Sequence, residues 1–154
     1  MLKIVLFQPE IPPNTGNIIR LCANTGCSLH LIEPLGFEWE DRKLRRAGLD
    51  YREFARVCRY PDLEAYRLQH GDSRLFGATT RAETRVDAVR SRPGDSLLFG
   101  PETRGLPADL LQQLGPAHCI RLPMRPDSRS LNLSNACAVV VYEALRQLEF
   151  PGLS

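Results

Sequence analysis

The chain has 154 residues, of which 43% are hydrophobic, and its formal net charge is only +2. This length suits one compact domain over residues 1–154 and excludes separate cofactor and substrate domains, so a macromolecular substrate must bind partly outside the fold. The near-neutral charge does not by itself indicate a nucleic-acid-binding protein. Only Lys3 and Lys43 among the basic residues are lysines. The rest are arginines, whose planar guanidinium suits bidentate phosphate recognition.

The five cysteines are odd in number and show no C-x-x-C spacing, which indicates reduced thiols rather than a disulfide framework or a zinc site. His30, His70 and His118 have no ligand spacing either, so no metal is expected. The chain starts on the strand-like LKIVLF, without a basic leader or an apolar run near the ~18 residues of a membrane span. We therefore expect a cytoplasmic protein that is neither exported nor inserted in a membrane.

Short β-rich runs alternate with helical patterns along the chain, which predicts an α/β fold with a mostly parallel sheet flanked by helices. In chain order, strands are predicted at Leu2–Phe7, Leu29–Glu33, Arg74–Ala78, Ser96–Phe99 and His118–Leu122. One helix lies between the first two strands and stops at Gly26, and further helices are predicted at Asp41–Ala47, Asp62–Gln69 and Ala108–Leu114. The polar, weakly patterned segment from Arg81 to Gly94 is predicted to be a surface excursion.

The last helix has the clearest pattern. Apolar residues recur at helical spacing until Pro151, on a face formed by Leu133, Ala136, Cys137, Val140, Val141, Ala144, Leu145 and Leu148. Val139 and Tyr142, together with Ala138, make the opposite face apolar too. A helix that is apolar nearly all round must be buried on more than one side, so we predict a homodimer with Val139 and Tyr142 in its interface.

A first polar stretch, PPNTGNIIR (residues 12–20), follows the first strand and opens a helix. A helix N-terminus presents free N–H groups and the positive end of the dipole, so Asn14, Asn17 and Arg20 are candidate ligand-binding residues. The alternative is that Asn14 or Thr15 caps the helix and Arg20 is a solvated charge. The spacing leaves both interpretations open.

A second stretch, FGPETRGLP (residues 99–107), follows a predicted strand. Gly100 and Gly105 have the spacing of a phosphate-binding P-loop, but Leu106 and Pro107 stand where that motif requires lysine and a hydroxyl residue, so an NTPase is excluded. No G-x-G-x-x-G follows a strand, which argues against a dinucleotide site. The stretch predicts a tight loop close to a ligand, or else a plain turn with an ion pair between Glu102 and Arg104.

A third stretch, residues 122–135, feeds the last helix with hydroxyl and amide groups beside Arg129. Such groups at a helix N-terminus suit an anionic or ribose-bearing ligand, and capping alone needs only one or two of them. Between the second and third predicted strands, Phe37, Trp39 and Tyr51 accompany a basic group. This basic group consists of Arg42, Lys43, Arg45 and Arg46. With the aromatic residues it suits RNA phosphates and a stacked base, and the alternative is a solvated basic helix face.

The segments NTGNIIR, FGPETRGLP and RSLNLSNA (residues 129–136), in this order, resemble the three motifs of the SPOUT RNA methyltransferases. The likeness extends over essentially the whole chain, including Gly36–Tyr51, and within the family the chain looks like the short single-domain tRNA enzymes. The resemblance implies S-adenosylmethionine as cofactor and 2′-O-methylation of the ribose of the tRNA wobble nucleotide, leucine tRNAs being the expected substrates. It also implies a C-terminal trefoil knot, which periodicity does not reveal, and a homodimer.

The resemblance further implies that the cofactor site is lined by Ala78, Gly100, Leu122 and Ser130. Arg20 is the first candidate for the active-site residue, supported by Asn14, Asn17, Ser130 and Asn132. A guanidinium with a pKa above ~12 is a poor proton acceptor, so we expect Arg20 to hold a phosphate and stabilise alkoxide charge. Two alternatives stay open: a non-catalytic RNA-binding or assembly protein with this fold, and a ribosomal RNA 2′-O-methyltransferase.

Overall fold

The computed structural model describes residues 1–40 and 56–154. Across these residues a single sheet, parallel at every pairing, is formed by β1 (Lys3–Phe7), β2 (Ser28–Ile32), β3 (Val57–Tyr60), β4 (Leu75–Ala78), β5 (Ser96–Phe99) and β6 (Cys119–Ile120). The α-helices described are α1 (Pro12–Thr25), α4 (Leu63–Gln69), α5 (Ala108–Leu114) and α6 (Leu133–Gln147). The predicted α/β fold is therefore confirmed, and the trefoil knot stays a prediction.

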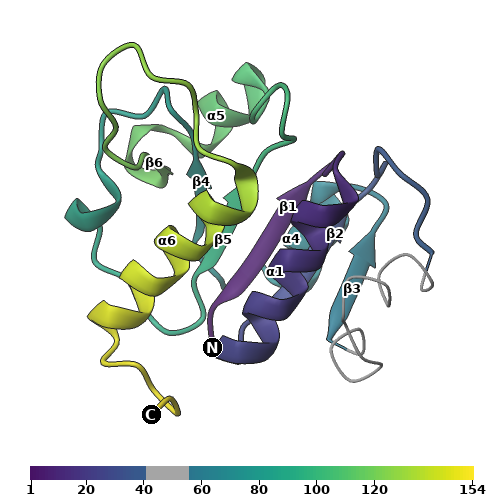
Figure 1. Cartoon of the computed structure of the whole chain (residues 1–154), viewed down its shortest axis with the longest axis horizontal. Helices are drawn as coiled ribbons and strands as arrows, with labels where there is room; N and C mark the ends of the chain where they lie inside the picture. Colours follow the sequence, from purple (N-terminus) through teal and green to yellow (C-terminus); the bar gives the residue numbers. More distant parts are fainter. Residues whose placement is uncertain (41–55) are drawn as a thin grey trace.

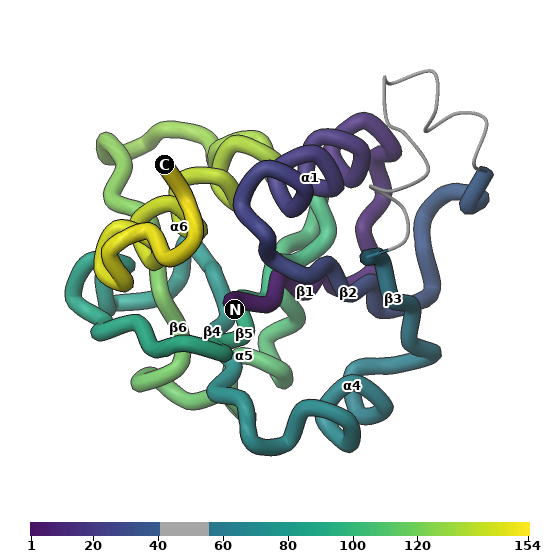
Figure 2. Tube along the Cα trace, turned by 90° about the horizontal axis from the view of Figure 1, so that it is seen from below, coloured from purple at the N-terminus to yellow at the C-terminus, as the bar shows by residue number. Residues whose placement is uncertain are grey.

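The strand order is β3-β2-β1-β5-β4-β6, and helices cover both faces of the sheet (Figure 1). α1 and α6 lie side by side on one face, and α4 and α5 lie on the other (Figure 2). The order reverses between β1 and β5, because the chain runs outward from β1 to β2 and β3, and the later strands lie on the other side. In open α/β sheets, ligands bind outside the carboxyl ends of the strands near such a reversal.

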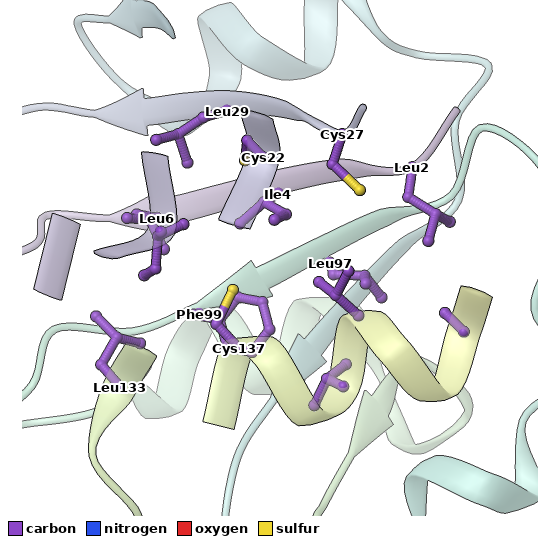
Figure 3. Close-up of a cluster of buried hydrophobic side chains, with 14 of the residues drawn as sticks. Leu2, Ile4, Leu6, Cys22, Cys27, Leu29, Leu97, Phe99, Leu133 and Cys137 are labelled. Carbon is purple, nitrogen blue, oxygen red and sulfur yellow. The ribbon is translucent and has the colours of Figure 1, made fainter. Parts of the chain in front are cut away.

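The main core lies between the sheet and the α1–α6 layer (Figure 3). Ile4, Leu29 and Leu97 from three neighbouring strands meet Cys22 of α1 and Cys137 of α6, and each of these five residues is at most 5% exposed. Burial raises the pKa of the Cys137 thiol well above its usual value, so this residue acts as a small apolar side chain. The predicted inward face of α6 is confirmed by this packing.

The opposite face of the sheet carries a smaller core that includes a polar cluster under α4. The two ring nitrogens of His30 are hydrogen-bonded to the Ser28 hydroxyl and the Tyr60 hydroxyl, each at 2.9 Å, and the Tyr60 oxygen lies 3.2 Å from Nε2 of His70. Burial, followed by the charges of His70 and Lys3, lowers the pKa of His30 to about 4. His30 is therefore neutral at pH 7 and its role is structural.

Two strands differ from those the sequence predicted. β3 was not predicted, because its four residues include the exposed Cys58 and Arg59 and show no regular alternation. β6 has only two residues, since a 3-10 helix at Pro116–His118 occupies the expected start of the strand. The short β6 is extended by a single parallel bridge between Arg85 and Arg121. The helix predicted at Asp41–Ala47 lies outside the described residues.

Candidate functional site

A cavity of about 290 Å³ opens at the carboxyl end of the sheet, where the chain leaves β4, β5 and β6. Its apolar walls include Phe99, Ile120 and Val140, and the loops after the strands add threonine and serine hydroxyls and backbone groups. This volume is near the lower end of the range for small-molecule sites. All four residues that the sequence resemblance assigned to the cofactor line this one cavity: Ala78, Gly100, Leu122 and Ser130.

Gly100, directly after β5, is the point where the loop folds back most tightly. A Cβ at this position would lie 2.3 Å from the backbone nitrogen of Leu106 and 2.4 Å from the carbonyl carbon of Gly105. The turn is closed by a hydrogen bond of 2.9 Å from the Gly105 N–H to the Pro101 carbonyl, and Gly105 itself has φ +68°. Only glycine fits at position 100, so this wall of the cavity is built from backbone.

The same loop is tied to the segment after β1. The Glu102 carboxylate accepts hydrogen bonds from the backbone N–H groups of Glu10, at 3.0 Å, and Ile11. In return, the Glu10 carboxylate accepts from the Thr103 hydroxyl at 2.7 Å and from the Thr103 N–H at 3.1 Å. We refer to these four residues as the β1–β5 clasp. Among the described contacts, the Glu102 carboxylate is bonded to these backbone N–H groups, and no ion pair joins it to Arg104.

The first and third polar stretches are also joined to each other. Asn132 is the N-cap of α6, and its side-chain oxygen accepts from the backbone N–H groups of Ser134 at 2.9 Å and Asn135 at 3.3 Å. Its Nδ2 donates to Oδ1 of Asn14 at 3.0 Å. Asn14 is only 5% exposed. Asn132 therefore caps one helix and fixes the start of another.

The residues predicted along α1 divide into buried and exposed groups. The N-cap of α1 is Ile11, which makes no side-chain cap, and Asn14 and Thr15 are buried within the helix. The alternative that Asn14 or Thr15 caps this helix is therefore wrong. Asn17 and Arg20 follow Asn14 at i, i+3 spacing, which places them on neighbouring turns, and both are exposed. Neither Asn17 nor Arg20 is among the residues that line the cavity of the same chain.

Two arginines line the cavity that the sequence analysis did not select as site residues, Arg81 and Arg104. Both are exposed, and neither makes an ion pair among the described residues, whereas Arg74 is paired with the buried Asp95 at 2.6 Å. Arg81 was placed at the start of a surface excursion. Its position three residues after β4, at the carboxyl edge of the sheet, is the signal that identifies it. Arg129 is exposed on the third loop but does not line the cavity.

The outer side of α6 carries exposed apolar side chains, as its sequence predicted. Val139 is 51% exposed and Tyr142 45%, and Phe150, three residues beyond the end of α6, adds a side chain that is 39% exposed. The rings of Tyr142 and Phe150 lie 6.5 Å apart between centroids. We refer to Val139, Tyr142 and Phe150 as the α6 patch.

The remaining predicted substrate residues, Arg42, Lys43, Arg45 and Arg46, lie outside the described residues. Within residues 1–40 and 56–154, the His, Cys, Asp and Glu side chains form no group of three or more that could hold a metal ion. Over the same residues, no helix is long and apolar enough to cross a membrane.

The parallel sheet, its glycine-tight loop and the three joined polar stretches define an α/β protein of the SPOUT methyltransferase class. The model of the SpoU rRNA Methylase family matches residues 1–142, and the chain belongs to this family. A relative from Escherichia coli (strain K12) named tRNA (cytidine(34)-2′-O)-methyltransferase is 61% identical over 152 residues, which cover 99% of this chain and 97% of the relative.

Solved structures give the same assignment. One described as "Structural insights into the 2-OH methylation of C/U34 on tRNA" superposes with a TM-score of 0.87 at 44% identity, covering 97% of each chain. The SpoU methyltransferase AviRb from Streptomyces viridochromogenes, solved in complex with the cofactor AdoMet, gives a TM-score of 0.78 at 25% identity. That likeness covers 97% of this chain but only 58% of AviRb.

Proposed function

We propose that this protein transfers a methyl group from S-adenosylmethionine to the ribose 2′-hydroxyl of nucleotide 34, the wobble position, of tRNA. One observation carries the proposal: the cavity gathers Ala78, Gly100, Leu122 and Ser130 in a chain that is 61% identical, over 99% of its length, to a relative named for this reaction. The reaction takes place in the cytoplasm, and leucine tRNAs are the expected substrates.

The cavity fits this cofactor. Gly100 and Leu122 line the cavity, Gly100 with backbone alone, apolar side chains flank them, and the lining carboxylate of Glu102 is already engaged by two N–H groups. The site therefore presents no unpaired acid to the described cavity, while Arg81 and Arg104 supply positive charge for an anionic group. When bound, S-adenosylmethionine supplies a methyl group on a positively charged sulfur, which is already activated for transfer.

The protein's own task is to align the ribose and to manage the proton of the 2′-hydroxyl. We assign Arg20 to a phosphate beside the reacting ribose, where its charge also stabilises the developing alkoxide, and a phosphate oxygen or water takes the proton. A guanidinium does not take this proton near neutral pH. Asn14, Asn17 and Asn132 supply hydrogen bonds that orient the nucleotide and the start of α1.

A second copy of the chain completes the site in this proposal. Asn17 and Arg20 do not line the cavity of their own chain, and the α6 patch exposes an apolar surface that suits another subunit. A homodimer formed through Val139 and Tyr142 brings α1 of one subunit toward the cavity of its partner. Tyr142→Asp should therefore give monomers and lose methyl transfer, and light scattering that finds an active wild-type monomer would refute the dimer.

The RNA itself is held by basic residues around the cavity and beyond it. We assign phosphate contacts to Arg129 on the third loop and to the sequence-predicted group of Arg42, Lys43, Arg45 and Arg46. A ribosomal RNA substrate is less well supported, because the relative that is 61% identical over nearly its whole length is named for a tRNA nucleotide.

The deciding experiment incubates the protein with labelled S-adenosylmethionine and, in parallel reactions, bulk tRNA or ribosomal RNA, and maps the methylated nucleotide. Methylation of the ribose at position 34 is the expected result. Label in ribosomal RNA alone would support the other enzyme. Cofactor binding by calorimetry without any methyl transfer would instead support a non-catalytic RNA-binding protein.

The role of Arg20 is tested separately. Arg20→Ala should lower the single-turnover rate by roughly 10²–10³ while cofactor affinity stays within about threefold. Arg20→Lys keeps the charge and loses a proton more easily, yet lacks the planar fork. A general base would be rescued in Arg20→Lys as the pH rises, and a bidentate phosphate clamp would not. Recovery to the wild-type rate at raised pH would overturn the clamp assignment.

A further inference from the structure

The β1–β5 clasp lies at the reversal of the strand order, between the segment that starts α1 and the loop that walls the cavity. The cavity itself lies one strand further along, at the ends of β5, β4 and β6. Ligands in this kind of sheet bind near the reversal. β1 and β5 are themselves paired, and the four clasp residues join the segments that follow the two strands, so these functional segments are joined by side chains rather than by a ligand.

We propose that Glu10 is a positioning residue: through Thr103, it fixes α1 and its exposed Asn17 and Arg20 relative to the cofactor loop. The proposal rests on the proposed function, since it gives Arg20 its role in methyl transfer. No motif of the sequence assigned a function to Glu10, and Thr103 entered only as a member of the FGPETRGLP loop that lines the cavity.

The two halves of the clasp serve different needs. α1 begins with Pro12 and Pro13, which have no N–H, so the free N–H groups near its start belong to Glu10 and Ile11. The Glu102 carboxylate accepts from both of them and so satisfies the backbone at this point. The Glu10 side chain is not needed for that purpose.

The contact between Glu10 and Thr103 is instead a direct tie across the strand reversal. Thr103 is exposed, and its hydroxyl and N–H groups would be solvated without Glu10. An exposed contact of this kind contributes little to folding. Its two hydrogen bonds, at 2.7 and 3.1 Å, join residues 93 positions apart in the chain. Such a contact constrains how two segments lie relative to each other.

The charge state of Glu10 supports a permanent tie. The hydrogen bonds from the Thr103 hydroxyl and N–H, with a smaller effect of Arg104, lower the pKa of Glu10. The carboxylate therefore stays ionised and accepts both bonds throughout the neutral pH range. Asn14, one turn into α1, is held independently by Asn132, so the start of the helix is fixed at two points.

The test compares Glu10→Ala with Glu10→Gln, because glutamine keeps an oxygen that accepts from Thr103. At saturating cofactor and tRNA, Glu10→Ala should lower the single-turnover rate about tenfold, and Glu10→Gln should stay within about threefold of wild type. Cofactor dissociation constants should stay within about threefold for both variants. Thr103→Val should lower the rate about as much as Glu10→Ala does, and Thr103→Ser, which keeps a hydroxyl, should keep the wild-type rate. Glu64→Gln, on α4 across the sheet, is the matched control and should leave the rate unchanged.

A double variant tests whether Glu10 acts through Arg20. In the Arg20→Ala background, Glu10→Ala should have less than a twofold further effect, because the group that it positions is gone. If Glu10→Ala also lowers the rate tenfold in the Arg20→Ala background, the two residues act independently and the proposal is overturned. A wild-type rate for Glu10→Ala would also overturn it, as would a parallel tenfold loss of cofactor affinity, which would mean that Glu10 only maintains the cavity.

Amide hydrogen exchange separates this proposal from the proposed function, since it requires no methyl transfer. Glu10→Ala should raise the exchange rates of the Asn17 and Arg20 amides at least threefold, with no change in α4. Unchanged exchange would overturn the positioning role. If the wild-type protein methylates no tRNA but Glu10→Ala still raises these exchange rates, the proposed reaction alone is overturned.

Discussion

Replacing Gly100 by alanine tests the close approach that shapes the cavity wall. The added Cβ would lie 2.3 Å from the Leu106 nitrogen, whereas ordinary contacts begin at 3.4 Å, so the backbone must separate by about 1 Å (3.4 − 2.3). The same loop carries Glu102, whose 3.0 Å hydrogen bond from the Glu10 N–H would lengthen to about 4 Å if the whole movement were taken there. The substitution should therefore deform the cavity and the β1–β5 clasp together.

The cost follows from overpacking, which typically destabilises by about 1–3 kcal/mol. For a chain of this size each kcal/mol lowers Tm by about 2–4 °C. If about half of the upper value of about 3 kcal/mol is also lost from the free energy of cofactor binding, the affinity for S-adenosylmethionine falls about tenfold, since about 1.4 kcal/mol is a factor of ten.

Calorimetric titration with S-adenosylmethionine and thermal unfolding measure both quantities. Gly115→Ala is the control, because Gly115 has φ +79° with nothing within 4 Å of its Cβ position and does not line the cavity. It should show only the backbone penalty of this glycine-specific conformation, about 1–3 kcal/mol, with wild-type cofactor affinity. Should Gly100→Ala also bind the cofactor with wild-type affinity, the steric reasoning at this loop would be refuted.

Three further predictions concern other regions of the protein. Asn132→Asp keeps the acceptor that caps α6 but loses the donor to Asn14, so the methylation rate should fall about tenfold with little change in Tm. Asn132→Ala loses the cap as well and should also cost about 1 kcal/mol of stability. A similar decrease of Tm in both variants would contradict this. Because the pKa of His30 is lowered from 6.5 to about 4, the unfolded chain takes up the proton first, and urea unfolding should show stability falling from pH 6.5 to 4 by at most about 3 kcal/mol. An unchanged acid limb in His30→Gln would refute that assignment. Alanine at the four sequence-predicted basic residues should weaken tRNA binding and make the slope of log K against log salt concentration shallower by about 0.9 for each phosphate interaction removed, with cofactor affinity unchanged. Equal loss of both affinities would point to a folding defect. These four are Arg42, Lys43, Arg45 and Arg46.

Periodicity predicted the elements whose burial repeats along the chain. The spacing from Leu133 to Leu145 predicted both the extent of α6 and its buried face, because a helix that packs on a sheet must repeat its apolar residues every three or four positions. β3 could not be found in this way. An edge strand of four residues with exposed Cys58 and Arg59 shows no repeating pattern of buried residues from which it could be predicted.

The amino-acid sequence was enough to establish the α/β class, the three polar stretches and, through their resemblance to a family, four of the residues that line the cavity. How these stretches meet became visible only in three dimensions: Glu102 is bonded to the backbone before α1 rather than to Arg104, Asn132 reaches Asn14, and Glu10 pairs with Thr103. The physical reason is that periodicity reports which face of an element leaves water. Which polar groups meet at the ends of the strands depends on strand order, and the order that sets β1 beside β5 leaves no local trace in the chain.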